Sequence, residues 1–451
     1  MTTPPSENQA DSLEKMRRQF DFGPYPRIPI DADPREASND LFIFNLVTPY
    51  YLRNRRVAET AGKVILDAGC GTGYKALALA KANPAAKIVG IDLSPKSIEL
   101  AQQRFAYHGY QDLAEFHVLS IEEVTQLGIQ FDYINCDETL YFFDDIAQGL
   151  SAFKSVLKPE GIIRANLHSA LQRRLFFQVQ EFLNFIGLME EDATDMAIPI
   201  FTEIMKSLRP EVFLKQGTGW NPKWEDLEEE ANKELLLANH LLKGDKGYRI
   251  SDMFDGIQRA GLEFISMVNW RHWNVEDLFQ EPDNLPSYLA MGLAESTLET
   301  LLTTYELLHP VHRLLDFWCT HPRQSPELLP VAEWTLEDWL RSQVILHPQL
   351  RTEAFQKAAL EAIQQNGPFM ISTFLSLPTL SPVTLSYDVA ALLLQLWDGP
   401  QPFTALVNFW QRIHPINLIT LEPTPPESAA QQVADALGKL EVFLYVLPEQ
   451  I

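Results

Sequence analysis

Apolar positions follow two different periods along the middle of the chain, and their alternation predicts an α/β fold. Short apolar runs bounded by turn residues, typical of buried strands, are followed by segments with apolar residues at helical spacing. The predicted strands cover residues 63–69, 86–93, 114–120, 131–137, 161–167 and 262–270. The helices predicted between them cover 74–83, 94–109 and 146–161. This alternation predicts a doubly wound, mostly parallel sheet with helices on both faces.

The same pattern predicts how the chain is divided into domains. Residues 1–40 form a predicted N-terminal arm: the first ~20 are polar enough to be disordered, and the four prolines in 21–34 favour an extended path. A single helix is predicted for 37–57. Residues 41–280 then form the sheet domain, interrupted by a helical insertion at 169–247. A helical middle region is predicted for 281–380.

The last segment, 381–451, reads as helix, turn, helix, helix and strand, an order that resembles a winged-helix module. Many such modules bind DNA through basic residues. This segment holds two basic and seven acidic residues, a net charge of −5. Phosphate contacts need Lys and Arg. We therefore expect a protein-interaction or structural unit.

Charge and cysteine content narrow the class of protein. The net charge of −24 disfavours nucleic acid and anionic membranes as partners. Three cysteines in 451 residues provide no disulfide framework and no metal-ligand spacing, so no metal is expected. No stretch reaches the roughly 18 apolar residues of a membrane helix, and the polar N-terminus lacks the features of a signal peptide. These features predict a cytoplasmic protein; they do not indicate an oligomeric state.

A glycine-rich loop, "DAGCGTG" at 67–73, follows the first predicted strand. A nucleotide P-loop would need Lys followed by Ser or Thr after the last glycine, and that hydroxyl is missing here. A dinucleotide fingerprint would need a glycine where Tyr74 stands, and its bulk opposes close helix–strand packing. A nucleoside ligand without phosphates is the third possibility. Asp92, which ends the second strand, can accept hydrogen bonds from both hydroxyls of a ribose.

The loop resembles motif I of class I S-adenosylmethionine-dependent methyltransferases, and the resemblance extends over the next ~100 residues. It implies the Rossmann-like methyltransferase fold and S-adenosyl-L-methionine as methyl donor. In that family the loop contacts the methionine part of the cofactor. The loop residues carried over are Asp67, Gly69, Cys70 and Gly71. The residues carried over for the nucleoside are Asp92 and Leu93, the latter against adenine. The third strand departs from the family, because Ser120 stands where many members place an Asp that accepts from the adenine amino group. The Ser120 oxygen can still accept, and the Ile121 backbone N–H can reach a ring nitrogen.

The fourth strand leads into the predicted acceptor site. The resemblance implies that Cys136 meets the methionine moiety and that Asp137 and Glu138 open onto the substrate. These carboxylates could orient an amine or take its proton, or one of them could only cap the following helix. His168, after the fifth strand, is the third catalytic candidate, although a lone histidine is often structural. Tyr25, in the N-terminal arm, could belong to a lid over the cofactor.

The expected chemistry is a direct displacement at the activated methyl group, for which alignment and water exclusion matter most. The overall layout resembles bacterial protein lysine methyltransferases with a regulatory middle domain and a winged-helix-like end. It favours a protein side-chain nitrogen as acceptor. The alternatives are a small-molecule N- or O-methyltransferase enclosed by the insertion, and a non-catalytic scaffold that only binds S-adenosylmethionine.

Overall fold

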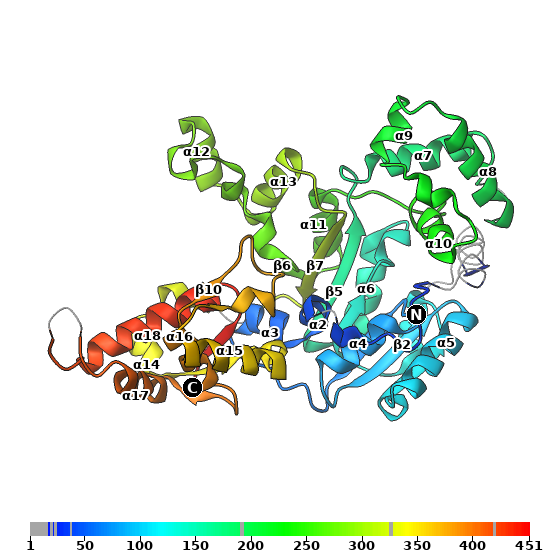
Figure 1. The fold of residues 1–451 in the computed structure, drawn as a ribbon. Helices are drawn as coiled ribbons and strands as arrows, with labels where there is room; N and C mark the ends of the chain where they lie inside the picture. Colours follow the sequence, from blue (N-terminus) through cyan, green and yellow to red (C-terminus); the bar gives the residue numbers. More distant parts are fainter. Residues whose placement is uncertain are drawn as a thin grey trace.

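A seven-stranded sheet organises the molecule (Figure 1). The computed structural model describes residues 17–18, 21, 25–36, 38–189, 194–323, 328–417 and 421–451. The predicted disorder of the first ~20 residues falls almost wholly outside that set. The strands are β1 (Val64–Ala68), β2 (Lys87–Asp92), β3 (Ala114–Val118), β4 (Phe131–Cys136), β5 (Leu157–His168), β6 (Glu263–Met267) and β7 (Leu314–Thr320). Their order is β3-β2-β1-β4-β5-β7-β6, with β7 antiparallel to both neighbours. The predicted doubly wound, mostly parallel sheet is confirmed.

Strand β7 corrects the predicted domain boundary. Residues 281–380 were expected to be helical, but β7 lies between β5 and β6 in the central sheet. The sheet domain therefore extends to Thr320 instead of ending at 280. Phe317 and Trp318, adjacent in β7, are both fully buried, one on each face of the sheet. A strand buried on both faces lacks the polar alternation that would separate it from a helix.

The two faces of the sheet are covered by different helices. Ile65, Tyr133 and Ile162 point to the face covered by α2 (Ser38–Phe44), α3 (Val47–Asn54) and α4 (Tyr74–Ala82). Their neighbours Leu66 and Ile163 point to the opposite face. That face carries α6 (Ile146–Val156), α11 (Ile250–Arg259) and α13 (Leu298–Leu308). Helix α5 (Pro95–Tyr107) packs beside β2 and β3.

The single helix predicted for 37–57 is broken into α2 and α3. Asn45 stands at the break, where its side chain donates to the carbonyl of Ala82 and accepts from the Val47 amide. Asn83 pairs in turn with the Leu46 amide and the Phe44 carbonyl. These buried amides satisfy the backbone groups that a continuous helix would have paired internally.

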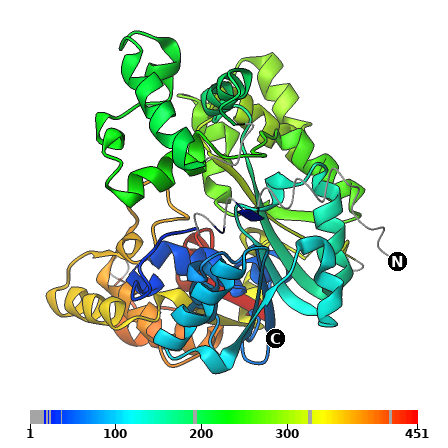
Figure 2. The ribbon, with the colours of Figure 1, turned by 90° about the vertical axis from the view of Figure 1, so that its right-hand side faces the viewer.

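Two additions follow the strand ends on one side of the sheet. The insertion between β5 and α11 is helical, as predicted, with α7 (Arg174–Phe185), α8 (Thr194–Ser207), α9 (Phe213–Gly217) and α10 (Glu230–Asn239). It has its own small core around Phe201 and Leu236. The connection between β6 and β7 carries α12 (Ser287–Ala294) and α13. Figure 2 shows both additions above the sheet.

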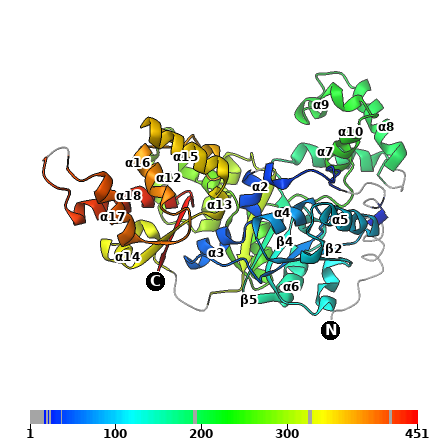
Figure 3. The same ribbon diagram turned by 60° about the horizontal axis from the view of Figure 1, so that its bottom comes forward.

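The C-terminal unit begins well before residue 381. A three-stranded antiparallel sheet, in the order β11-β8-β12, joins β8 (Ser342–Leu346) to β11 (Gln401–Pro402) and β12 (Val446–Gln450). The helices packed with it are α14 (Leu336–Leu340), α15 (Glu353–Gln365), α16 (Tyr387–Leu394), α17 (Phe403–Ile413) and α18 (Pro426–Glu441). A further two-stranded sheet pairs β9 (Phe369–Met370) with β10 (Thr384–Leu385). The boundary predicted at 381 cuts both sheets, and the winged-helix resemblance is not confirmed. Figure 3 shows this unit and the insertion at opposite ends of the molecule.

Candidate active site

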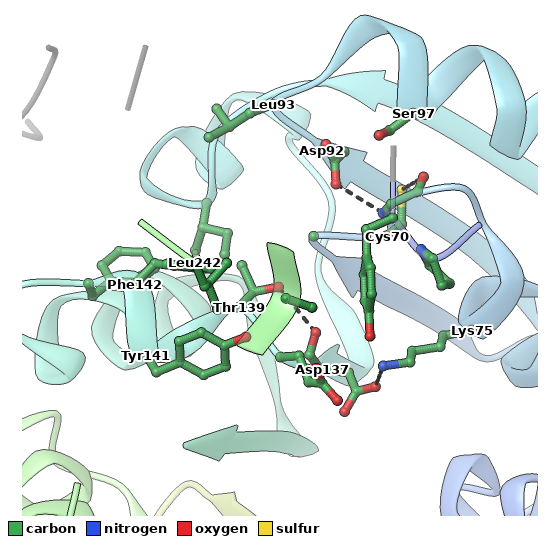
Figure 4. A pocket seen from close by; sticks show the side chains of 18 of the residues that line it. Cys70, Lys75, Asp92, Leu93, Ser97, Asp137, Thr139, Tyr141, Phe142 and Leu242 are labelled. Atoms are coloured by element: carbon green, nitrogen blue, oxygen red, sulfur yellow. Dashed lines mark hydrogen bonds and ion pairs between the residues drawn. The ribbon is translucent and has the colours of Figure 1, made fainter. Parts of the chain in front are cut away.

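A pocket runs along the edge of the sheet where the parallel strands end (Figure 4). Its lining follows the strand order: Leu119 and Ile121 come after β3, Asp92 after β2, and the glycine loop after β1. Asp137 and the residues after it come from the end of β4. Ligands of open α/β sheets bind at this edge. Members of all three predicted groups, for the nucleoside, the methionine part and the acceptor, therefore line one cavity.

The glycine loop is tightly enclosed. Gly69 and Gly71 have φ angles of +77° and +50°, a region that favours glycine. A Cβ on Gly69 would lie 2.3 Å from Thr139 Oγ1, and one on Gly71 only 2.1 Å from the carbonyl oxygen of Tyr25. Both glycines line the pocket. Side chains at these positions would collide with the chain that closes the site.

The N-terminal arm lies across this loop. The amide of Thr72 donates to the Tyr25 carbonyl at 3.1 Å, and the Thr72 hydroxyl donates to the Pro26 carbonyl at 2.7 Å. Arg104, buried on α5, donates to the carbonyls of Ile28 and Pro29 and to that of Thr72. One guanidinium thus joins the arm to the glycine loop, and the predicted arm forms one wall of the pocket.

Asp92 lines the pocket at the end of β2. Its Oδ2 accepts the Gly71 amide at 2.9 Å and its Oδ1 accepts the Ser94 amide at 2.8 Å. Burial raises the pKa of this carboxyl, while the two amides oppose the shift. A carboxylate has about four lone-pair directions. Asp92 therefore keeps acceptor capacity for hydroxyl groups in the pocket.

Asp67, Cys70 and Cys136 are buried around the loop. Asp67 Oδ1 accepts from Asn135 at 2.7 Å, whereas Oδ2 has no hydrogen-bond partner among the described residues. Burial raises the pKa of Asp67 to about 7. Cys70 reaches the pocket, but Cys136 and Asp67 do not line it. Burial raises the pKa of both thiols, so neither provides a thiolate nucleophile.

The residues after β3 differ from the prediction in one respect. Ile121 lines the pocket together with Leu119 and Glu122, but Ser120 does not. The Ser120 hydroxyl instead donates to Glu123 Oε2 at 3.0 Å. With Leu93 also in the lining, this end of the cavity is mainly apolar, as an aromatic base requires.

Asp137 is the centre of a buried polar network. It accepts from the amide group of Asn166, from Arg164 at 3.2 Å, and from Lys75 in a close ion pair. Burial alone would raise the pKa of Asp137, but Lys75 and Arg164 outweigh it and hold that pKa well below its usual range. Asp137 is a fixed anion with little tendency to take a proton.

Glu138 faces the pocket from a left-handed backbone position, with φ at +55°. The Asn166 side chain holds this conformation by accepting the Glu138 amide at 2.7 Å. The Glu138 carboxylate pairs closely with Arg313. Burial opposes its ionisation, but Lys75 and Arg313 prevail, so the pKa of Glu138 lies below its ordinary value.

His168 lies behind the pocket and does not line it. Its ring stacks on Tyr141 at 3.9 Å, and Tyr141 is a lining residue. Burial lowers the pKa of His168, so the ring is neutral at pH 7. Nδ1–H donates to Asp245 at 2.6 Å, which leaves Nε2 to accept from Arg313 at 3.3 Å. The catalytic role predicted for His168 is not supported by this position; the ring supports Tyr141.

The insertion covers the pocket. Glu234, Leu237 and Ala238 of α10, with Leu242 after it, belong to the lining. Glu234 Oε1 accepts the backbone amide of Arg27 at 3.1 Å, so arm and insertion meet over the cavity. The side chain of Asp245, at the end of the insertion, is fully buried and also accepts from Arg173 and Gln180.

Sequence reasoning did not assign Lys75, Tyr141, Arg313 or Asp316. Arg313 lies immediately before β7 and Asp316 lies within it, in the segment that was predicted to be helical. The Asp316 carboxylate accepts two hydrogen bonds from the Arg164 guanidinium, at 2.7 and 3.0 Å. One signal was available for Lys75. A cation in the first turn of a helix is disfavoured by the helix dipole, so it indicates an anionic partner.

The residues present fit the implied cofactor. The apolar end after β3 suits adenine, Asp92 suits a ribose, and Gly69, Cys70 and Gly71 line the pocket between them and the end of β4. No group of three or more His, Cys, Asp or Glu side chains that could hold a metal ion occurs within the described ranges. None of the described helices is long and apolar enough to span a membrane.

Comparison with known proteins agrees with this geometry. Residues 59–232 match the family model described as "Methyltransferase domain". An uncharacterized protein of Synechococcus sp. is 29% identical over 71% of this chain and 73% of its own length. Malonyl-[acyl-carrier protein] O-methyltransferase of Acetivibrio thermocellus is 35% identical, over 22% of this chain and 33% of that enzyme.

A solved structure shares the fold over nearly the whole chain. PKMT2 from Rickettsia typhi has a TM-score of 0.55 and 15% identity, and the match covers 91% of this chain and 75% of that one. The same protein has been solved with AdoHcy. From the matched family model, the sheet order and the cofactor pocket together, we conclude that the chain carries a class I, S-adenosylmethionine-dependent methyltransferase domain.

Proposed function

We propose that the protein methylates an amine nitrogen of a protein side chain, a lysine in particular. The observation that carries the proposal is the lining of the pocket, which contains six carboxylates and only two basic side chains. Glu138, Asp144 and Glu234 contribute near the end of β4 and under the insertion. An excess of negative charge attracts a cationic acceptor and disfavours an anionic one.

Aromatic side chains complete the acceptor end. Tyr25, Tyr141, Phe142 and Phe143 line the same region. The four-carbon stem of lysine can pack against such walls while its ammonium reaches a carboxylate. Aromatic faces also attract ammonium groups. A lysine side chain matches both properties of the cavity.

The chain's residues would act mainly by binding and alignment. Glu138 is ionised, and it attracts the ammonium without keeping its proton. The amine then releases that proton to solvent before its lone pair attacks. Burial, with Glu138 adding to it, raises the pKa of Tyr25 to about 12. The Tyr25 hydroxyl therefore stays protonated and can orient the nitrogen. S-adenosylmethionine supplies the electrophilic methyl group when it is bound.

The test is labelling of lysate proteins with purified enzyme and isotopically labelled S-adenosylmethionine. We expect labelled methyl groups on lysine, strongly reduced with the Asp92→Ala variant at the same cofactor concentration. Label confined to the small-molecule fraction would refute a protein acceptor. That outcome would favour an enclosed small amine, which the cover formed by α10 could accommodate.

A further inference from the structure

The ion pair between Lys75 and Asp137 lies within the cofactor pocket, next to the glycine loop (Figure 4). Lys75 is the second residue of α4, immediately after the loop, and Asp137 follows β4, the strand beside β1. Both side chains are shielded from solvent, with 27% and 6% of their surface exposed. The pair therefore lies where the pocket passes from the loop to the acceptor end.

The pair retains capacity for a ligand. An ammonium has three N–H donors, and Asp137 Oδ2 takes one of those of Lys75. Asp137 uses its other oxygen for Arg164 and Asn166, so Oδ2 keeps a free lone-pair direction. A cation and an anion thus stand side by side with unused donors and acceptors.

We propose that Lys75 and Asp137 bind the amino-acid end of the cofactor, Lys75 through the α-carboxylate and Asp137 through the α-ammonium. The nucleoside residues occupy the β3 and β2 ends of the pocket, so the opposite end of the same ligand extends past the loop towards α4 and β4. A zwitterion enters a buried cavity at low cost only where both of its charges are matched. The inference depends on the cofactor and is independent of the methyl acceptor.

The experiment measures calorimetric affinities of the full chain for three probes. They are S-adenosylhomocysteine, the same molecule without its carboxylate, and 5′-methylthioadenosine, which lacks the whole amino-acid end. The wild type should prefer S-adenosylhomocysteine to the decarboxylated amine by about 10–100-fold, the range of charge-assisted hydrogen bonds. This comparison needs no variant.

The variant Lys75→Met should bind S-adenosylhomocysteine more weakly by about the same factor. Its affinities for the other two probes should stay within about 3-fold of those of the wild type, because only the carboxylate loses its partner. Lys75→Arg should restore most of the preference, since it keeps the charge. Arg27→Gln is the matched control, because Arg27 is the other basic side chain of the lining.

Three results would overturn the assignment while leaving the cofactor in place. The first is equal wild-type affinity for the first two probes. The second is a Lys75→Met variant that weakens all three probes alike, which would make Lys75 only a structural partner of Asp137. The third is loss of the preference in Arg27→Gln instead. Failure of the wild type to bind S-adenosylhomocysteine at all would overturn the inference together with the cofactor assignment. A non-protein acceptor would leave the inference untouched.

Discussion

The substitution Gly71→Ala tests how closely the N-terminal arm lies on the glycine loop. The new Cβ would stand 2.1 Å from the Tyr25 carbonyl oxygen, where ordinary contact begins at 3.4 Å. The arm or the loop must therefore move by more than an ångström. Such a shift breaks the contacts of Thr72 with the carbonyls of Tyr25 and Pro26, each worth about 1 kcal/mol.

Backbone strain adds to this effect, because alanine at a φ of +50° costs about 1–2 kcal/mol. Gly128 provides the matched control, with a φ of +63° and open space around its Cβ position. Gly128→Ala carries the strain without the collision. We expect Gly71→Ala to lower the free energy of unfolding by about 2 kcal/mol more than Gly128→Ala does.

Two assays measure the difference. Urea denaturation compares the stabilities of the two variants, and limited trypsin digestion followed by mass spectrometry measures cleavage after Arg27 in the arm. Gly71→Ala should be cut faster there than the control. Equal stability and equal cleavage in the two variants would refute the close packing of the arm on the loop.

Three further predictions concern the pocket. Asp92→Ala should cost about 2–4 kcal/mol of S-adenosylhomocysteine binding free energy by calorimetry; unchanged affinity would exclude Asp92 from the nucleoside site. Glu138→Gln should lower turnover by about 10²-fold, because the acceptor amine loses the charge that aligns it, while that affinity stays within a few-fold; a lower melting temperature with full activity would indicate a structural role instead. Burial raises the pKa of Asp67 from 3.8 to about 7. Between these pH values the folded state holds a proton that the unfolded chain has lost, so the stability of the wild type falls as the pH rises. The variant Asp67→Asn keeps the oxygen that accepts from Asn135 but cannot titrate, so it should not show that fall. In urea denaturation, the stability of the variant minus that of the wild type should therefore increase from pH 5 to pH 8. A difference that stays constant with pH would contradict the raised pKa.

Local patterns predicted most of the sheet. Six strands were recognisable because each is a short apolar run between turn residues. β7 was not recognisable, because "LLDFWCT" at 314–320 is buried on both faces and follows a helical stretch. The C-terminal strand β8 was also missed. Its partners β11 and β12 are more than fifty residues away, so its pairing leaves no local pattern.

The residues of the candidate site also fall into two groups, those that the sequence could place and those that it could not. Residues that follow strand ends, such as Asp92 and Ile121, could be placed in one pocket from the topology alone. Their charge partners could not. Lys75 meets Asp137 across 62 positions and Arg313 meets Glu138 across 175. Such pairs depend on how separate strands are ordered in the sheet. The acidity of Asp137 and Glu138, on which any role as a base depends, was therefore not deducible from the sequence.

The domain built on the seven-stranded sheet and the C-terminal unit share one hydrophobic core, and this has a consequence for folding. Tyr51 of α3 donates to the Pro448 carbonyl at 2.9 Å, and Thr48 contacts the buried ring of His347 at 3.1 Å. Phe42 packs on the same ring, in one continuous apolar cluster that spans both parts. A chain cut before β8 would expose this surface of α2 and α3 to water. The C-terminal unit is thus a building block of the enzyme's own interior, and we expect heat to unfold the two parts in one cooperative transition.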